Sequence, residues 1–79
     1  MLTSAQCRAA RALMEWSRDQ LADASKVAVR TIVDFERSAR EPREVTKEAL
    51  RRALEAAGVV FLSDGDCVEG GAGVRLRKA

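Results

Sequence analysis

Basic side chains gather in the middle of the chain, where they could bind the phosphates and base edges of a nucleic acid. The whole chain has a net charge of only +2, from 14 Lys and Arg against 12 Asp and Glu, so bulk charge alone does not indicate such a partner. Between residues 26 and 43 the bases outnumber the acids. The bases are Lys26, Arg30, Arg37, Arg40 and Arg43, and the acids are Asp34, Glu36 and Glu41. The middle of the chain is therefore its electropositive part.

Catalytic chemistry has few candidate residues in this sequence. The chain has no His and no Tyr, and its only cysteines are Cys7 and Cys67. We expect Cys7 to be a small buried hydrophobe in a first helix and Cys67 to be a loop thiol with no specific role. The glycine cluster at residues 70–73 lacks the Lys-Ser/Thr pair and the following helix of a phosphate-binding loop. The sequence predicts a protein that is not an enzyme and that has no cofactor and no metal site.

The length of the chain, 79 residues, leaves room for one small domain. Aromatic residues make up only 4% of the composition and many apolar residues are Ala, a mixture that favours closely packed short helices. The sequence shows no signal peptide, transmembrane run or lipidation motif. We therefore expect a cytoplasmic protein with no disulfide and no membrane partner.

Two helices are predicted in the first 25 residues. The segment from Thr3 to Glu15 has Thr3 or Ser4 as an N-cap, followed by apolar residues at three- and four-residue spacing. A second helix, from Arg18 to about residue 24, begins after Ser17, because Ser followed three residues later by Gln is a capping box.

A third predicted helix follows at once. Residues 25–27 are too few for a true loop and predict a tight turn between packed helices. In the next segment, from Ala28 to about Arg37, Ile32 and Phe35 share one face. The residues that can lie towards the outside of this helix are Val29, Arg30, Thr31 and Asp34.

A fourth helix and two strands complete the predicted fold. Residues 38–43 contain the only proline and form a linking loop. An apolar stripe then predicts a helix from about residue 44 to residue 57, ended by Gly58. Short strands are expected at 59–62 and 74–77, and such a pair needs a packing partner. The fold class is therefore mainly α, with a four-helix domain over residues 1–58 and a β extension over 59–79. The core candidates are Trp16, Leu21, Ile32, Phe35, Leu50 and Leu54.

A capped helix, a three-residue turn and a second short helix with a polar leading face form the helix-turn-helix geometry that lets one helix enter the major groove. The residues that carry this pattern are Ser17-Arg18-Asp19-Gln20-Leu21-Ala22, Val27, Thr31-Ile32 and Phe35-Glu36-Arg37. They resemble the Cro/repressor-like family, often called xenobiotic-response-element (XRE) regulators. The resemblance covers about residues 3–58, and residues 53–59 are similar to that family's fourth helix and its exit.

The resemblance implies roles for named side chains. Base contacts would come from Val29, Arg30, Thr31 and Asp34, with Arg30 the best candidate because Arg can bind guanine O6 and N7 together. A solvated charge or plain phosphate contact for Arg30, and helix packing alone for Thr31, are the alternatives. Phosphate contacts would come from Arg18, Lys26, Arg37, Arg40 and Arg43, each of which could also be a solvated surface charge. Arg11 and Glu36 would form a structural salt bridge between the first and third helices.

Two residues depart from the family pattern in the turn. Lys26 stands where the family usually has Gly, and a non-glycine residue in left-handed geometry costs roughly 1–2 kcal/mol. Ala28 stands where Ser usually caps the third helix, and a missing cap costs about 1 kcal/mol. We therefore expect the turn, and with it the angle of the third helix, to differ from the family.

The function implied by the resemblance is that of a sequence-specific regulator of transcription. It would bind double-stranded DNA as a homodimer, acting as a repressor at a palindromic operator with the third helix in the major groove. We expect the dimer contact in the predicted strands, at Val59, Val60, Phe61, Leu62, Val74 and Leu76, with or without a contribution from the predicted fourth helix. The alternative is an antitoxin or antiactivator that binds a protein partner, for example by strand addition.

Overall fold

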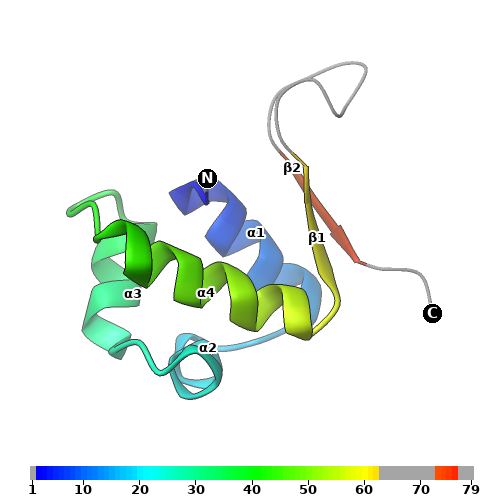
Figure 1. Ribbon diagram of the computed structural model, residues 1–79, viewed down its shortest axis with the longest axis horizontal. Coiled ribbons are helices and arrows are strands. Elements are labelled where there is room, and N and C mark those ends of the chain that lie inside the picture. Colours follow the sequence, from blue (N-terminus) through cyan, green and yellow to red (C-terminus); the bar gives the residue numbers. More distant parts are fainter. Residues whose placement is uncertain (1, 63–72, 77–79) are drawn as a thin grey trace.

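The computed structural model describes residues 2–62 and 73–76, and in these residues the chain forms four helices and a two-stranded sheet (Figure 1). The helices are α1 (Ser4–Met14), α2 (Arg18–Ser25), α3 (Val29–Glu36) and α4 (Glu44–Ala56), and the strands are β1 (Val59–Leu62) and β2 (Gly73–Leu76). The mainly α fold class with a C-terminal strand pair is confirmed. Cys67, the predicted strand end at residue 77 and most of the glycine cluster lie outside the described residues.

The core lies where the helices meet. Its large members, Leu21, Ile32, Phe35, Leu50 and Leu54, are all at most 2% exposed, as the apolar periodicity predicts. Small residues of α1, Cys7 and Ala10, are completely buried and let α1 approach its neighbours closely. Trp16, the sixth core candidate, packs against this cluster but remains partly exposed.

Side-chain caps explain where the first two helices begin. The predicted capping box of α2 is present: the N–H of Gln20 donates to Ser17 Oγ at 3.1 Å, and the Ser17 N–H donates back to Gln20 Oε1 at 2.8 Å. Thr3 and Gln6 form the same reciprocal pair at the start of α1. Each box satisfies two backbone donors that a helix leaves unpaired at its N-terminus.

The turn between α2 and α3 contains both residues that depart from the family pattern, Lys26 and Ala28. Lys26 takes the left-handed conformation, with φ of 64°, and its N–H donates to the Ala22 carbonyl at 2.8 Å. The hydroxyl of Ser25 donates to the Leu21 carbonyl at 2.7 Å and accepts from the Val27 N–H at 3.2 Å. Ser25 thus stabilises a turn that lacks the favoured glycine.

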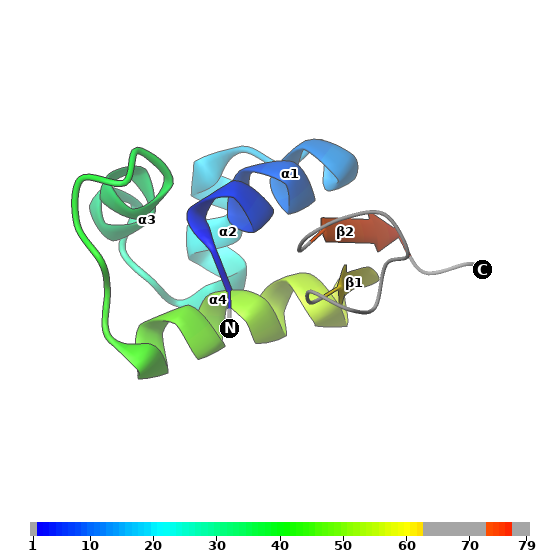
Figure 2. The ribbon, with the colours of Figure 1, turned by 90° about the horizontal axis from the view of Figure 1, so that it is seen from above.

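The strand pair packs on the helices. The helices are therefore the packing partner that such a short strand pair needs. β1 and β2 are antiparallel, with Phe61 opposite Val74, and both side chains pack against the core. The Gln6 side chain donates to the Gly73 carbonyl at 3.3 Å, and the Arg51 guanidinium of α4 lies 5.8 Å from the centre of the Phe61 ring. β2 starts at Gly73, one residue before the predicted start. The hairpin and α3 lie at opposite ends of the molecule (Figures 1 and 2).

The start of α3 offers a direct test of the turn. The methyl group of Ala28 makes no cap hydrogen bond, so Ala28→Ser supplies an acceptor for an N–H of the first turn. We expect Ala28→Ser to raise the free energy of unfolding by about 1 kcal/mol, measured by urea denaturation. Ala28→Val, which has no oxygen, is the control. Equal stability of the Ser and Val variants would contradict a capping effect.

Candidate nucleic-acid interface

Helix α3 has one face in the core and one towards solvent. Ile32, Phe35 and Glu36 are buried, whereas Val29 is 37% exposed and the Arg30 side chain 82% exposed. Among the four predicted base-contact residues, Thr31 and Asp34 are only half-buried, so both still reach the surface. All four residues therefore reach the surface of α3.

Arg30 and Asp34 form an ion pair along this face. Arg30 Nε lies 3.5 Å from Asp34 Oδ2, one helical turn further on. The arginine is exposed, so the pair contributes little to stability. A ligand that binds Arg30 can therefore replace the Asp34 contact at little cost.

Exposed cations lie at both ends of α3. Lys26 precedes the helix, and Arg37, Arg40 and Arg43 follow it. None of the four forms an ion pair with another residue of the described chain. The loop that carries the last two is tied to α3, because the N–H groups of Ala39 and Arg40 both donate to the Asp34 carbonyl, at 2.8 and 3.3 Å. These positive charges are thus held beside the helix while their side chains face water.

Below this surface, the Glu36 carboxylate is buried at the junction of three helices. Its Oε2 accepts from Arg11 Nε at 2.8 Å and its Oε1 accepts from Arg11 Nη2 at 2.9 Å, so the salt bridge implied by the family resemblance is present as a two-point contact. Arg18 Nε, from the first turn of α2, donates to Oε1 at 3.1 Å. The Cys7 thiol of α1 donates to Oε2 at 3.3 Å. One carboxylate therefore links α3 to α1 and α2.

The Arg11 and Arg8 guanidinium groups extend the same junction to the backbone. Arg11 Nη1 donates to the Trp16 carbonyl at 2.9 Å, in the link between α1 and α2. Arg8 Nη1 donates to the Glu36 carbonyl at 2.6 Å, at the end of α3. The C-terminus of α3 is thereby held by side chains as well as by its own carboxylate.

The ionisation of Glu36 follows from these contacts. Burial on its own raises the pKa of the Glu36 carboxyl, but hydrogen bonds from Arg11, Cys7 and Arg18 outweigh it and hold that pKa below its ordinary value of 4.5. Burial and the adjacent carboxylate raise the pKa of the Cys7 thiol to about 12. Cys7 therefore stays protonated and acts as a donor. The expected burial of Cys7 is confirmed, but its role includes a hydrogen bond as well as packing.

The sequence analysis does not identify two of the hydrogen-bond partners of Glu36, the Cys7 thiol and Arg18. Arg18 is predicted there as a phosphate contact, whereas its Nε is bound to Glu36 and its side chain is 43% exposed. Its position at the start of a capped helix is readable from the sequence, but its distance to Glu36 depends on how α2 and α3 cross. The remaining guanidinium donors of Arg18 still have access to solvent.

Several of the predicted dimer residues pack against the core of their own chain. Val59 is 1% exposed and belongs to the core, and Phe61 and Val74 pack against that core. Val60 is half-buried and Leu76 is 45% exposed. The side chain of Leu62 lies outside the described part. A face that already covers the helices is not available to a second molecule, which leaves only Val60, Leu76 and the strand edges.

Other kinds of site find no support in the part of the chain that the structure describes. Residues 2–62 and 73–76 contain no group of three or more His, Cys, Asp or Glu that could hold a metal ion. No helix within them is long and apolar enough to cross a membrane. No protein-family model matches the chain, and no curated protein is significantly similar to it.

The Glu36 junction predicts a large loss of stability when its charge is removed. Glu36→Gln keeps the shape of the side chain but leaves the Arg11 guanidinium without its anionic partner. We expect the free energy of unfolding at neutral pH to fall by about 3 kcal/mol, measured by urea denaturation. Asp23→Asn, at an exposed position of α2, is the control and should change stability by less than about 0.5 kcal/mol. Similar values for the two variants would show that the junction contributes little.

The same carboxylate predicts an acid-dependent stability. Because the pKa of Glu36 is lower in the folded than in the unfolded chain, its contribution is fully present above pH 4.5 and is lost as the pH falls through the folded pKa. The difference in unfolding free energy between the parent and Glu36→Gln should therefore shrink as the pH drops below 4.5. Parallel unfolding curves for the two proteins across this range would contradict the assignment.

Proposed function

We propose that the protein is a sequence-specific double-stranded-DNA-binding regulator of transcription that places α3 in the major groove. The observation that carries this proposal is the geometry of α3. One face is fixed in the core and at the Glu36 junction, while the other presents Val29, Arg30, Thr31 and Asp34 beside exposed cations at both helix ends. A rigidly held helix with a free polar face, following a second helix through a tight turn, suits base-edge contacts.

The two classes of side chain have different proposed roles. Arg30 is the residue for direct base contact, because its guanidinium is exposed and can bind two acceptors of guanine. Lys26, Arg37, Arg40 and Arg43 would contact phosphates on either side of the groove and set the position of the protein. Arg18 could contribute with the guanidinium donors that do not face Glu36.

The proposed mode of action is repression by a homodimer. One helix of eight residues contacts only a few base pairs, so two copies on a palindromic operator would give the required specificity. Occupying such a site near a promoter excludes other proteins from the same DNA. This form of regulation requires no ligand and no catalytic group.

DNA binding can be tested with a duplex selected by the parent protein from a random-sequence library. We expect fluorescence anisotropy to show tighter binding to the selected duplex than to a scrambled duplex of equal composition, at matched salt. Arg30→Ala should reduce this preference by about 5- to 100-fold while binding to the scrambled duplex changes little. The failure of the library to enrich any duplex, or equal affinity for both duplexes, would contradict the proposal.

Salt dependence separates the phosphate contacts from the base contact. Arg43→Ala should weaken binding to both duplexes alike and reduce the slope of log affinity against log salt by about 1. Arg75→Ala, an exposed change in β2 at the end of the molecule opposite α3, is the matched control and should alter neither quantity. An effect of Arg75→Ala as large as that of Arg43→Ala would mean that nonspecific charge, rather than the α3 region, binds the DNA.

A further inference from the structure

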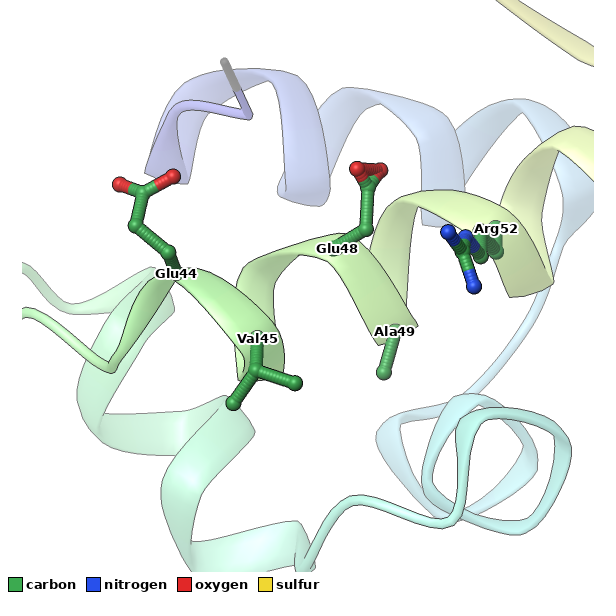
Figure 3. A pocket seen from close by; sticks show the side chains of 5 residues that line it. All are labelled: Glu44, Val45, Glu48, Ala49 and Arg52. Atoms are coloured by element: carbon green, nitrogen blue, oxygen red, sulfur yellow. The ribbon is translucent and has the colours of Figure 1, made fainter.

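The outer face of α4 has an apolar centre that the rest of the described chain does not cover. Val45 is 72% exposed, more than Leu13, Val29 or Leu76, and Ala49 follows it one turn later. Both line a shallow hollow with Glu44, Glu48 and Arg52, all on α4 (Figure 3). We call these five residues the α4 face. An exposed β-branched residue in a helix gains nothing from packing here, so its burial by another molecule would be favourable.

The charges of the α4 face follow a simple order along the helix. Glu44 and Glu48 come first and Arg52 comes last. Glu48 and Arg52 have the i,i+4 spacing and the Glu-before-Arg order that favour an ion pair within a helix. Even so, neither residue forms an ion pair within the described chain. Each therefore has a charged group available to a molecule bound on this face.

We propose that the α4 face binds a second copy of the same chain, with the two α4 helices antiparallel across a two-fold axis level with residue 50. In an antiparallel pair, a residue two positions after the axis faces the partner's residue two positions before it. Arg52 of one copy then faces Glu48 of the other, and the symmetry produces this contact twice. The carbon chain of Arg52 would cover Val45 of the second copy.

The charge order disfavours the parallel alternative. Two parallel α4 helices would place Glu48 against Glu48 and Arg52 against Arg52, which is repulsive at both ends. Ala49, small and half-buried beside the crossing point, lets the two backbones approach closely. The face is thus complementary to itself in only one of the two arrangements, and that arrangement is closed and two-fold.

The area of the contact predicts a weak dimer. α4 has 13 residues, so it is about 20 Å long at 1.5 Å per residue. A single helix face of this length covers less than the roughly 800 Å² per partner of a standard interface. The protein should therefore exchange between monomer and dimer with concentration. The α4 dimer does not depend on the proposed DNA binding, because it is expected in the absence of DNA.

Charge exchange provides the experiment. Sedimentation equilibrium of the full chain without DNA, from about 10 µM to about 1 mM, should show a rising dimer fraction for the parent. Glu48→Arg and Arg52→Glu should each raise the dimer dissociation constant about tenfold or more, because each replaces an attraction by a repulsion. An equimolar mixture of the two variants should dimerise again. In the mixed dimer, the arginine introduced at position 48 of one variant faces the glutamate introduced at position 52 of the other.

Several controls keep the outcome decisive. Both substituted positions are exposed, and circular dichroism should show that both variants keep the parent's helix content. Asp23→Lys, a charge reversal on the exposed side of α2, should leave the dissociation constant unchanged. A parent that stays monomeric throughout, or variants that dimerise no better when mixed, would overturn the proposal. A dimer that survives Glu48→Arg but is lost in Leu76→Glu would place the contact on the hairpin instead.

Discussion

The buried carboxylate of Glu36 is the group around which α1, α2 and α3 are arranged. Burying an isolated carboxylate costs several kcal/mol. The folded state is therefore stable only if hydrogen-bond donors surround the Glu36 carboxylate. Arg11 supplies two hydrogen bonds, and Arg18 and Cys7 supply one each. Because these donors come from α1 and α2, the three helices can satisfy the carboxylate in only one relative orientation. An apolar residue at this position could pack as tightly, but it would not impose the planar geometry of a guanidinium–carboxylate pair.

This constraint extends directly to the solvent-facing side of α3. Glu36 is the last residue of α3, and the Arg8 guanidinium holds its backbone carbonyl. Ile32 and Phe35 hold the same face one turn earlier in the core. The exposed residues on the other side are consequently presented at a fixed angle, although the turn before the helix contains neither the glycine nor the serine of the family pattern. Ser25 stabilises that turn through its hydroxyl, and the junction at the far end of α3 sets the direction.

The sequence predicts well those features that depend on neighbours along the chain. Apolar spacing identifies the helices and five of the six core candidates, and the Ser17–Gln20 spacing locates the start of α2. The Thr3–Gln6 box has the same spacing and is equally readable from the sequence. Features that depend on how elements cross are harder to predict. The partner of Arg18 is set by the approach of α2 to α3, and the apolar pattern of Val59 and Phe61 does not distinguish burial against the chain's own helices from burial against a second molecule.

The contact between Gln6 and Gly73 has a consequence for the order in which the protein forms. It joins the first helix to the last described strand, across 67 residues of chain. Closing so long a loop is slow, because chain entropy is lost before the contact contributes any stabilisation. During synthesis α1 leaves the ribosome long before β2 exists, so the side of α1 that β2 covers stays open to water until residues 73–76 have emerged. The contacts of α1, α2 and α3 with Glu36 can therefore form before β2 is available to pack on α1.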